Sequence, residues 1–276
     1  MAEKTEFEKD MENLRQLQKE GKINPEYYGG NLENIAKHLP EWRKDVDVME
    51  FDDNEERLQA WRELEGSKHE LAEYGRGSDL DKLMADDWGN RSAYVGKAIA
   101  DRGRDKDLDQ LVNSEEDVVR VAVVKQGRDK DLDKLVSDES REVRITVAQQ
   151  GRDKDLDKLV SDKQSIVRET VAKQGRDKDL DKLVHDKEGY VRSEVAKQGR
   201  DKDLDRLVSD KDWHVRSTVA EQGRDKDLDK LAHDEKAIIR SQVAEQREKK
   251  QAEASRDVDP DILAKRREAA RRGLER

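Results

Sequence analysis

The 276-residue chain contains no cysteine, and this absence excludes several classes of site. Disulfide bridges, thiolate metal sites, iron–sulfur clusters and cysteine nucleophiles all need the thiol. The sequence also has no apolar run of membrane-spanning length, and its start, Met-Ala-Glu-Lys-Thr-Glu-Phe, lacks the basic and then apolar regions of a signal peptide. We therefore expect a soluble, cytoplasmic protein.

Aromatic residues are also scarce, at 4% of the chain, and hydrophobic residues reach only 33% against 45% charged residues. Such a composition alone predicts disorder, because little apolar surface is available for burial. A unit of 24 residues, however, occurs six times without a gap, and each copy opens with Gly-Arg-Asp-Lys-Asp-Leu-Asp. The copies begin at Gly103, Gly127, Gly151, Gly175, Gly199 and Gly223. A fixed period of this length predicts a solenoid, in which each unit buries its apolar face only against its neighbours.

Within one unit, whose positions we number 1 to 24 from the glycine, the pattern predicts two helices. The glycine can adopt the left-handed conformation that ends the preceding helix. A short helix should follow through Asp-Leu-Asp-Lys-Leu-Val, with aspartates near its positive N-terminal end. Position 12 is Asp in five of the six copies, and we expect the second, longer helix to begin there. In the copy that starts at Gly151, Val167, Val171 and Ala172 have helical spacing and would form its buried face.

The sequence outside these copies predicts caps. Residues 1–66 form an acidic, helical N-terminal cap domain, in which Thr5 and Glu8 have the capping-box pattern. Residues 67–102 resemble a degenerate first repeat, with four residues inserted in the loop from Asp86 to Ala93. The six regular units occupy 103–246. In residues 247–276, Arg247 replaces the glycine, and we expect a helical C-terminal cap or a basic tail.

The residues of the unit resemble a known family. The pattern Leu-x-x-Leu-Val-x-Asp, four variable residues, then Val-Arg-x-x-Val-Ala occurs at 156–172, 180–196 and 204–220. It resembles the leucine-rich repeat variant and the wider group of HEAT-like helical repeats. The resemblance implies an all-α, right-handed-type α-solenoid of stacked two-helix units between helical caps, with one helix per unit lining a shared face. Some members of the variant group carry a cysteine-ligated iron–sulfur domain, which this chain lacks the cysteines to bind.

A six-residue step from aspartate to arginine recurs in five copies. It could form a phosphate-binding ladder, or each arginine could pair with an aspartate of its own or the adjoining unit and fix the stacking angle. We adopt the structural interpretation, because every Lys or Arg of the unit has an Asp close by. In the first copy Ser114 replaces the aspartate, so Arg120 is predicted to be unpaired. The other pairs are Asp138 and Arg144, Asp162 and Arg168, Asp186 and Arg192, Asp210 and Arg216, and Asp234 and Arg240.

Motifs for metals, cofactors or catalysis are weak. Asp153, Asp155 and Asp157 match the start of a calcium-binding loop, but Lys158 and Gln164 stand where that loop needs Gly and Glu. No His-Glu-x-x-His spacing, phosphate loop or nucleophile elbow is present. We therefore predict no metal, no cofactor, no small-molecule substrate, no membrane contact and no enzymatic activity.

Variation among the copies is concentrated at positions 13–16, whereas positions 1–10 are nearly identical. If position 16 faces solvent, its residues form an aromatic and aliphatic row with Trp213 beside it, enriched in types that anchor interfaces. Neutral drift, or packing against the next unit, would explain the same variation. We lean towards function at Tyr190, Trp213 and His214. The position-16 row consists of Val118, Glu142, Ile166, Tyr190, His214 and Ile238.

These observations predict a non-enzymatic scaffold that binds a protein or peptide partner. The expected contacts are Ile166, Tyr190, Trp213, His214 and Ile238, with Glu142 and Val118 from the same row. A first alternative is nucleic-acid binding, which the net charge of −10 disfavours and which would need Arg120 to converge with the tail residues Lys265, Arg266, Arg267, Arg271 and Arg272. A second is an inhibitor whose acidic segment 1–74 mimics nucleic acid and blocks a nucleic-acid-binding enzyme.

Overall fold

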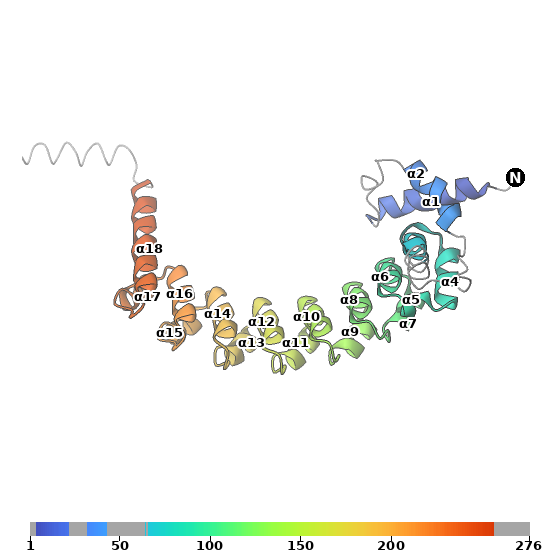
Figure 1. Cartoon of the computed structure of the whole chain (residues 1–276). Coiled ribbons are helices and arrows are strands. Elements are labelled where there is room, and N and C mark those ends of the chain that lie inside the picture. Colours follow the sequence, from blue (N-terminus) through green and yellow to red (C-terminus); the bar gives the residue numbers. More distant parts are fainter. Residues whose placement is uncertain (1–3, 22–31, 43–63, 65, 257–276) are drawn as a thin grey trace, which may run out of the picture. The chain divides into compact units, whose positions relative to one another are not determined.

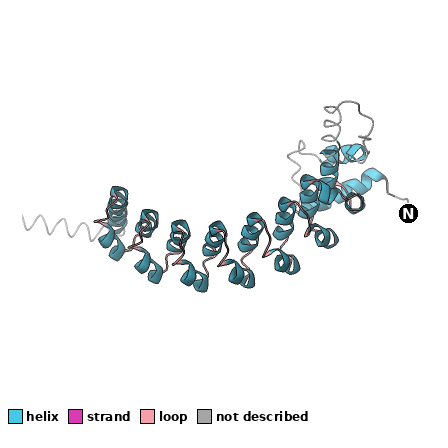
Figure 2. Ribbon diagram, turned by 60° about the horizontal axis from the view of Figure 1, so that its bottom comes forward, coloured by secondary structure: helices cyan, strands magenta, loops and turns pink. Residues whose placement is uncertain are grey.

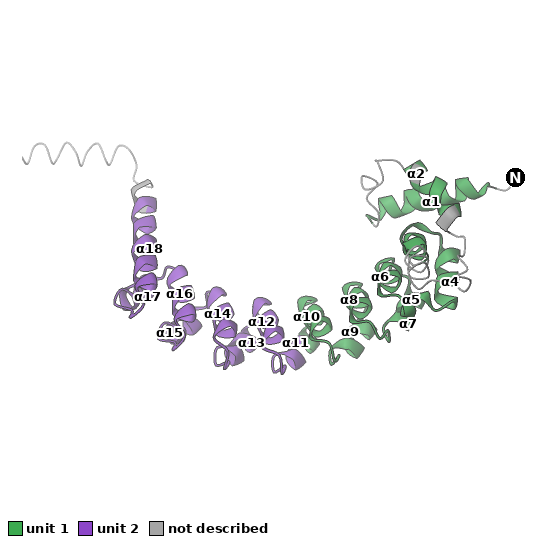
Figure 3. Ribbon diagram, in the orientation of Figure 1, with its two compact units in different colours: residues 1–155 green, residues 156–276 purple. Residues whose placement is uncertain are grey.

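The structure is a computed structural model, and it describes residues 4–21, 32–42, 64 and 66–256. It forms two compact units, residues 1–155 (unit 1) and 156–276 (unit 2), which are described separately (Figure 3). All regular secondary structure in the described ranges is helical, with no strand among them. The predicted all-α solenoid is confirmed.

Unit 1 begins with helices that precede the regular copies. α1 and α2 pack together through Leu14, Leu17, Ile35 and Leu39, all of which are buried. Thr5 is the N-cap of α1, and the predicted capping box with Glu8 is present. The elements of unit 1 are α1 (Glu6–Lys19), α2 (Leu32–Trp42), a helix over 66–74, α4 (Gly77–Ala85), α5 (Trp88–Arg91), α6 (Ala93–Asp101), α7 (Asp105–Leu111), α8 (Asp117–Lys125), α9 (Asp129–Leu135) and α10 (Arg141–Gln149) (Figure 1).

Unit 2 continues the two-helix pattern, and α11 (Asp153–Leu159) spans the boundary. The second helices α12, α14 and α16 pack side by side, and α16 packs against α18. The short first helices form a second row beside them (Figure 2). The predicted two helices per 24-residue repeat are therefore confirmed. The elements are α12 (Ser165–Lys173), α13 (Asp177–Leu183), α14 (Gly189–Lys197), α15 (Asp201–Leu207), α16 (Trp213–Glu221), α17 (Asp225–Leu231) and α18 (Ala237–Arg256).

The core lies between these two layers and repeats with the sequence. In the copy that starts at Gly175, the first helix buries Leu180 and Leu183, and the second buries Val191 and Val195, each at most 2% exposed. The same positions are buried in the other copies. Because each core segment is completed by the neighbouring unit, the low apolar content of the chain is sufficient for a folded array.

The glycine at position 1 adopts the predicted left-handed conformation in all six copies, with φ between 70° and 72°. At Gly175 a Cβ would lie 3.0 Å from Oε1 of Gln198, the last residue of the same unit. The backbone therefore needs glycine here for two reasons, its dihedral angle and the close approach of the glutamine.

The predicted start of the second helix at position 12 is wrong, because the second helices begin at position 15, as α14 does at Gly189. The aspartate at position 12 instead forms a turn with the residue two places on. Asp186 Oδ1 accepts a hydrogen bond from the Glu188 backbone N–H at 2.9 Å. This local bond competes with helix formation and delays the helix by three residues.

The four residues inserted in the degenerate repeat fold as the short helix α5, which places Trp88 in the core at 6% exposure. Gly96 packs against this helix so closely that a Cβ would lie 2.1 Å from the Gly89 carbonyl oxygen. No side chain fits at residue 96, which occupies the place of the repeated arginine.

Candidate functional site

The arginine at position 18 pairs with the aspartate at position 12 of the next unit, and we call this series the inner ladder. Arg168 donates to both carboxylate oxygens of Asp186 at 2.6 and 2.8 Å, and its third nitrogen donates to the Asp162 carbonyl oxygen at 2.7 Å. Both side chains are at most 8% exposed. Arg192 with Asp210 and Arg216 with Asp234 repeat the arrangement. The guanidinium groups are committed to the joint between units and present no free phosphate-binding surface.

The prediction that Arg120 is unpaired is wrong. Its guanidinium donates to both carboxylate oxygens of Asp138 at 2.8 and 2.9 Å. Each arginine pairs with the aspartate of the following repeat, so the residue that would pair with position 114 is residue 96. Position 114 is Ser and residue 96 is Gly, so this pair is absent. At the other end Arg240 donates only to main-chain oxygens among the described residues, Asp234 at 2.6 Å and Glu235 at 3.1 Å.

A second series of ion pairs, the outer ladder, was not predicted. The arginine at position 2 binds the aspartate at position 5 of its own unit and those at positions 3 and 7 of the preceding unit. Arg200 contacts Asp203 at 2.6 Å, Asp177 at 2.9 Å and Asp181 at 2.8 Å. Lys202, at position 4, also contacts Asp181 at 2.6 Å. Hydrogen bonds from this lysine and from the arginine hold the pKa of Asp181 below its usual range.

The outer ladder accounts for the aspartates of the Asp-x-Asp-x-Asp motif. Asp155 accepts from Arg152 at 2.7 Å, and Asp157 contacts Arg176 at 2.9 Å and Lys178 at 2.6 Å. Cationic side chains therefore take the oxygens that a calcium ion would need. The signal in the sequence was the near-identity of positions 1–7 in every copy, which local helix capping does not require.

At the two ends of the repeat array, residues of the end helices α1 and α18 supply the missing partners of the outer ladder. In unit 1, α1 supplies Glu6 and Asp10 to Arg76, whose Nε lies 3.1 Å from Asp10 Oδ1. In unit 2, α18 continues past residue 246, because the glycine that would end it is replaced by Arg247. Arg247 contacts Asp229, and Lys250 contacts Asp225, each at 2.6 Å. These residues take the places of the arginine and lysine of a following unit.

The position-16 row of unit 2 lies at the surface. Ile166, Tyr190 and Ile238 are 38%, 47% and 53% exposed, and His214 is also exposed. Trp213 is half-buried, with its ring centroid 3.6 Å from that of His214. Tyr190 also contacts the preceding 24-residue repeat, where its hydroxyl hydrogen-bonds with Ser165 Oγ. Tyr190 is therefore both exposed and held in place by a neighbour.

The position-16 row of unit 1 has a different character. Val118 is 37% exposed, and Glu142 accepts a hydrogen bond from Arg141 at 2.8 Å. Tyr94, at 68% exposure, occupies the equivalent place in the degenerate repeat, and sequence reasoning missed it. The alignment of Val95 with Val119 was the available signal, since it assigns residue 94 to position 16.

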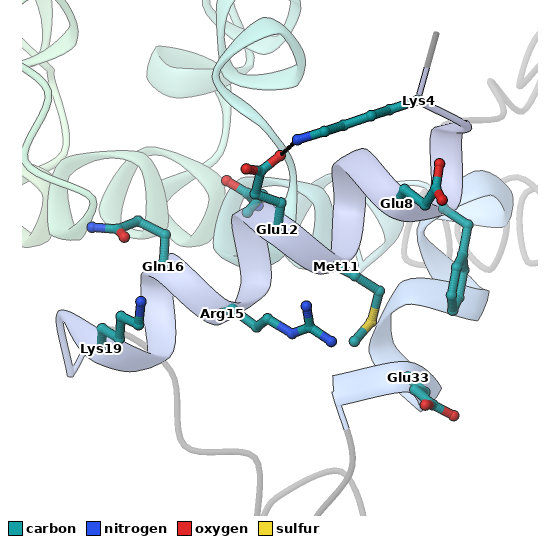
Figure 4. Close-up of a pocket in the computed structure, with 10 residues that line it drawn as sticks. Lys4, Glu8, Met11, Glu12, Arg15, Gln16, Lys19 and Glu33 are labelled. Carbon is teal, nitrogen blue, oxygen red and sulfur yellow. Dashed lines mark hydrogen bonds and ion pairs between the residues drawn. The ribbon is translucent and has the colours of Figure 1, made fainter. Parts of the chain in front are cut away.

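A hollow of about 760 Å³ lies along α1, with Lys4, Met11, Glu12 and Arg15 on its wall (Figure 4). Lys4 donates to Glu12 at 2.6 Å, and this bond lowers the pKa of Glu12. Lys4 and Glu12 thus pair with each other, and the side chains shown form no nucleophile and base pair. Across the ranges that the structure describes, no cluster of His, Asp or Glu is placed to hold a metal ion. Within the same ranges, no helix is both long enough and apolar enough to cross a membrane.

Comparison with known proteins supports the fold. The chain is similar to a solved leucine-rich repeat variant with a novel repetitive structural motif, with a TM-score of 0.56 and 23% identity over 75% of this chain and 93% of that one. A designed armadillo repeat protein in complex with the peptide (KR)4 matches with a TM-score of 0.27 and 18% identity over 76% of this chain and 98% of that one. The first likeness shows a shared solenoid fold. No protein-family model and no curated protein matches the sequence.

Proposed function

We propose that this protein is a non-enzymatic binding scaffold whose partner, a protein or peptide, docks on the position-16 row of unit 2. One observation carries the proposal: the apolar residues at positions 6, 9, 17 and 21 of every repeat are buried, whereas this row exposes large apolar side chains. Contiguous exposed apolar residues are typical of interfaces, and tyrosine and tryptophan are enriched among their energetic centres.

The spacing of the row suits an extended segment. Packed helices lie roughly 8–10 Å apart, and an extended chain advances about 3.3 Å per residue. A segment that crosses α12, α14, α16 and α18 would therefore meet one row residue with about every third residue of its own. Because the Tyr190 hydroxyl is held by Ser165, this side chain loses little entropy on binding.

The alternatives have less support. Nucleic-acid binding would need Arg120, whose guanidinium is already paired with Asp138. The tail residues from Lys265 to Arg272 lie outside the described residues. Of the acidic segment 1–74 that an inhibitor would use, residues 22–31 and 43–63 also lie outside them. The domain limits 1–66, 67–102, 103–246 and 247–276 stay predictions.

The proposal is tested by capture of partners from a lysate of the native host, with the intact chain and a Tyr190→Ala/Ile238→Ala variant as baits. Both residues are exposed, so the variant should keep the fold and lose the partner. Tyr94→Ala removes an exposed aromatic from unit 1 and is the matched control, which should capture the partner normally. Recovery that depends on nucleic acid, and that the double variant leaves unchanged, would contradict the proposal.

A further inference from the structure

Unit 2 carries an excess of positive charge where the first helix of each repeat ends and the turn to the second helix follows. We define this surface, positions 8, 13 and 14 of the repeats, as the loop edge. In unit 2 it holds eight Lys or Arg residues and three acidic ones. The basic residues are Lys158, Lys163, Lys182, Lys187, Arg206, Lys211, Lys230 and Lys236, and the acidic ones are Glu188, Asp212 and Glu235.

These basic side chains differ from the other cations of the repeat, because no carboxylate among the described residues pairs with them. The arginines and lysines of the two ladders, by contrast, have aspartate partners. Two of the three acidic side chains of the loop edge are already engaged. Asp212 accepts from the His214 backbone N–H at 3.0 Å, and Glu235 lies 3.3 Å from Arg216. The loop edge of unit 2 therefore has unbalanced positive charge.

A hollow of about 390 Å³ gathers part of this charge between two successive repeats. Lys187, Arg206 and Lys211 line it, together with Asp186 and Asp210. Both aspartates are neutralised by the arginines of the inner ladder, each through two hydrogen bonds. The cations of its lining outnumber the two aspartates, so the hollow has a net positive charge and attracts anionic groups.

The same surface in unit 1 has the opposite charge. Position 13 holds Glu115 and Glu139, and position 8 holds Gln110 and Lys134. Lys134 is hydrogen-bonded to Asn113. Positive charge at the loop edge is thus a property of unit 2 and is not required by the repeat fold.

The position-13 lysines lie close to the position-16 row along the chain. Position 13 comes three residues before position 16, so Lys187 precedes α14 by two residues and Tyr190 lies in its first turn. A partner on the row would meet both kinds of side chain. Ile166 and Ile238 cannot stack on nucleic-acid bases as aromatic side chains do, which favours a peptide over a nucleic acid.

We propose that the partner of unit 2 is an extended acidic peptide, whose apolar side chains contact the position-16 row and whose carboxylates contact the lysines and arginines of the loop edge. This inference rests on the proposed function and specifies the chemistry of its partner. Charge complementarity would orient the segment and exclude basic peptides, because opposed like charges are costly at an interface.

The test is selection of peptides from a displayed library of randomised segments on the intact chain. We expect the selected sequences to combine Asp or Glu with apolar residues. Their affinity, measured by fluorescence anisotropy, should fall roughly tenfold or more in a Lys187→Glu/Lys211→Glu variant and weaken with added salt. Lys125→Glu/Lys134→Glu, with the same change of charge in unit 1, is the matched control and should bind normally. Circular dichroism checks that each variant is folded.

The outcomes separate the two proposals. Selected peptides that are neutral or basic, or that bind the Lys187→Glu/Lys211→Glu variant normally while losing affinity for Tyr190→Ala/Ile238→Ala, would overturn the acidic partner and leave the scaffold function intact. Failure to select any peptide would overturn the acidic peptide, whereas the scaffold function is decided by the capture experiment with Tyr190→Ala/Ile238→Ala. Single-stranded oligothymidylate that binds the intact chain, and no longer binds Lys187→Glu/Lys211→Glu, would assign the loop edge to nucleic acid.

Discussion

The inner and outer ladders use the same charged groups in two environments, and the comparison shows how burial changes their role. The inner pair of Arg192 and Asp210 is at most 9% exposed, with two charge-assisted hydrogen bonds. In the outer ladder Lys202 and Asp181 are 60% and 50% exposed. Buried ion pairs are costly to disrupt one partner at a time, whereas exposed pairs contribute little individually. The inner ladder therefore fixes how neighbouring units meet, and the outer ladder acts through its number of contacts.

Acid should weaken both ladders together, and this is the largest expected effect. Hydrogen bonds from the following lysine and arginine lower the pKa of Asp157 and Asp205 from the usual 3.8, and those from Arg216 do the same for Asp234. The folded state thus favours the ionised aspartates, and its stability is lost as pH falls through the lowered pKa values. We expect the melting temperature, followed by circular dichroism, to be flat from pH 7 to about 5 and to fall steeply below about 4. A melting temperature at pH 3 equal to that at pH 7 would show that the ladders do not stabilise the fold.

Breaking one inner pair should have the next largest effect. Arg192→Leu keeps similar bulk and leaves Asp210 buried without its cation, which should lower the free energy of unfolding by about 3–5 kcal/mol. The double variant Arg192→Leu/Asp210→Asn removes the stranded charge and keeps an oxygen for the Asp212 N–H, so it should recover part of the loss. Urea unfolding monitored by circular dichroism measures both. A loss below about 1 kcal/mol for the single variant would place the inner ladder with ordinary surface pairs.

Breaking one outer pair should have the smallest effect. Asp181→Asn removes the charge that Lys202 and Arg200 share, and we expect only a small decrease in the free energy of unfolding because the carboxylate is half exposed. In the parent chain, 0.5 M sodium chloride should lower the free energy of unfolding measured by the same urea titration, because salt screens exposed pairs. The decrease should be smaller in the variant, which already lacks one of these pairs. If Asp181→Asn costs as much as Arg192→Leu, burial does not distinguish the two ladders.

The sequence was sufficient for the fold because the period places the same apolar residues at the same positions in each unit. It left the direction of the inner ladder open. In an exact repeat, an arginine six residues after one aspartate is also eighteen residues before the next, so periodicity cannot identify its partner. Only the irregular ends, Ser114 with Gly96 and Arg240, separate the two possibilities.

The candidate site was only partly predictable for a related reason. Variation at position 16 drew attention to the row, but its exposure depends on packing between units, which half-buries Trp213. The basic loop edge was missed because lysines inside and outside the ladders have similar sequence surroundings. Lys182 and Lys178 both lie beside aspartates in the chain, and only the fold distinguishes the free ammonium from the one bound to Asp157.

Because the inner-ladder pairs within each compact unit all run from one repeat forward to the next, the repeat behaves as a modular part with the same connector at each side. Removing or adding one complete unit of 24 residues would regenerate the same contacts, provided that α1 and α18 still close the two ends. Duplication of one repeat then lengthens the position-16 row by one side chain. Partner length can therefore evolve separately from the chemistry that holds the scaffold together.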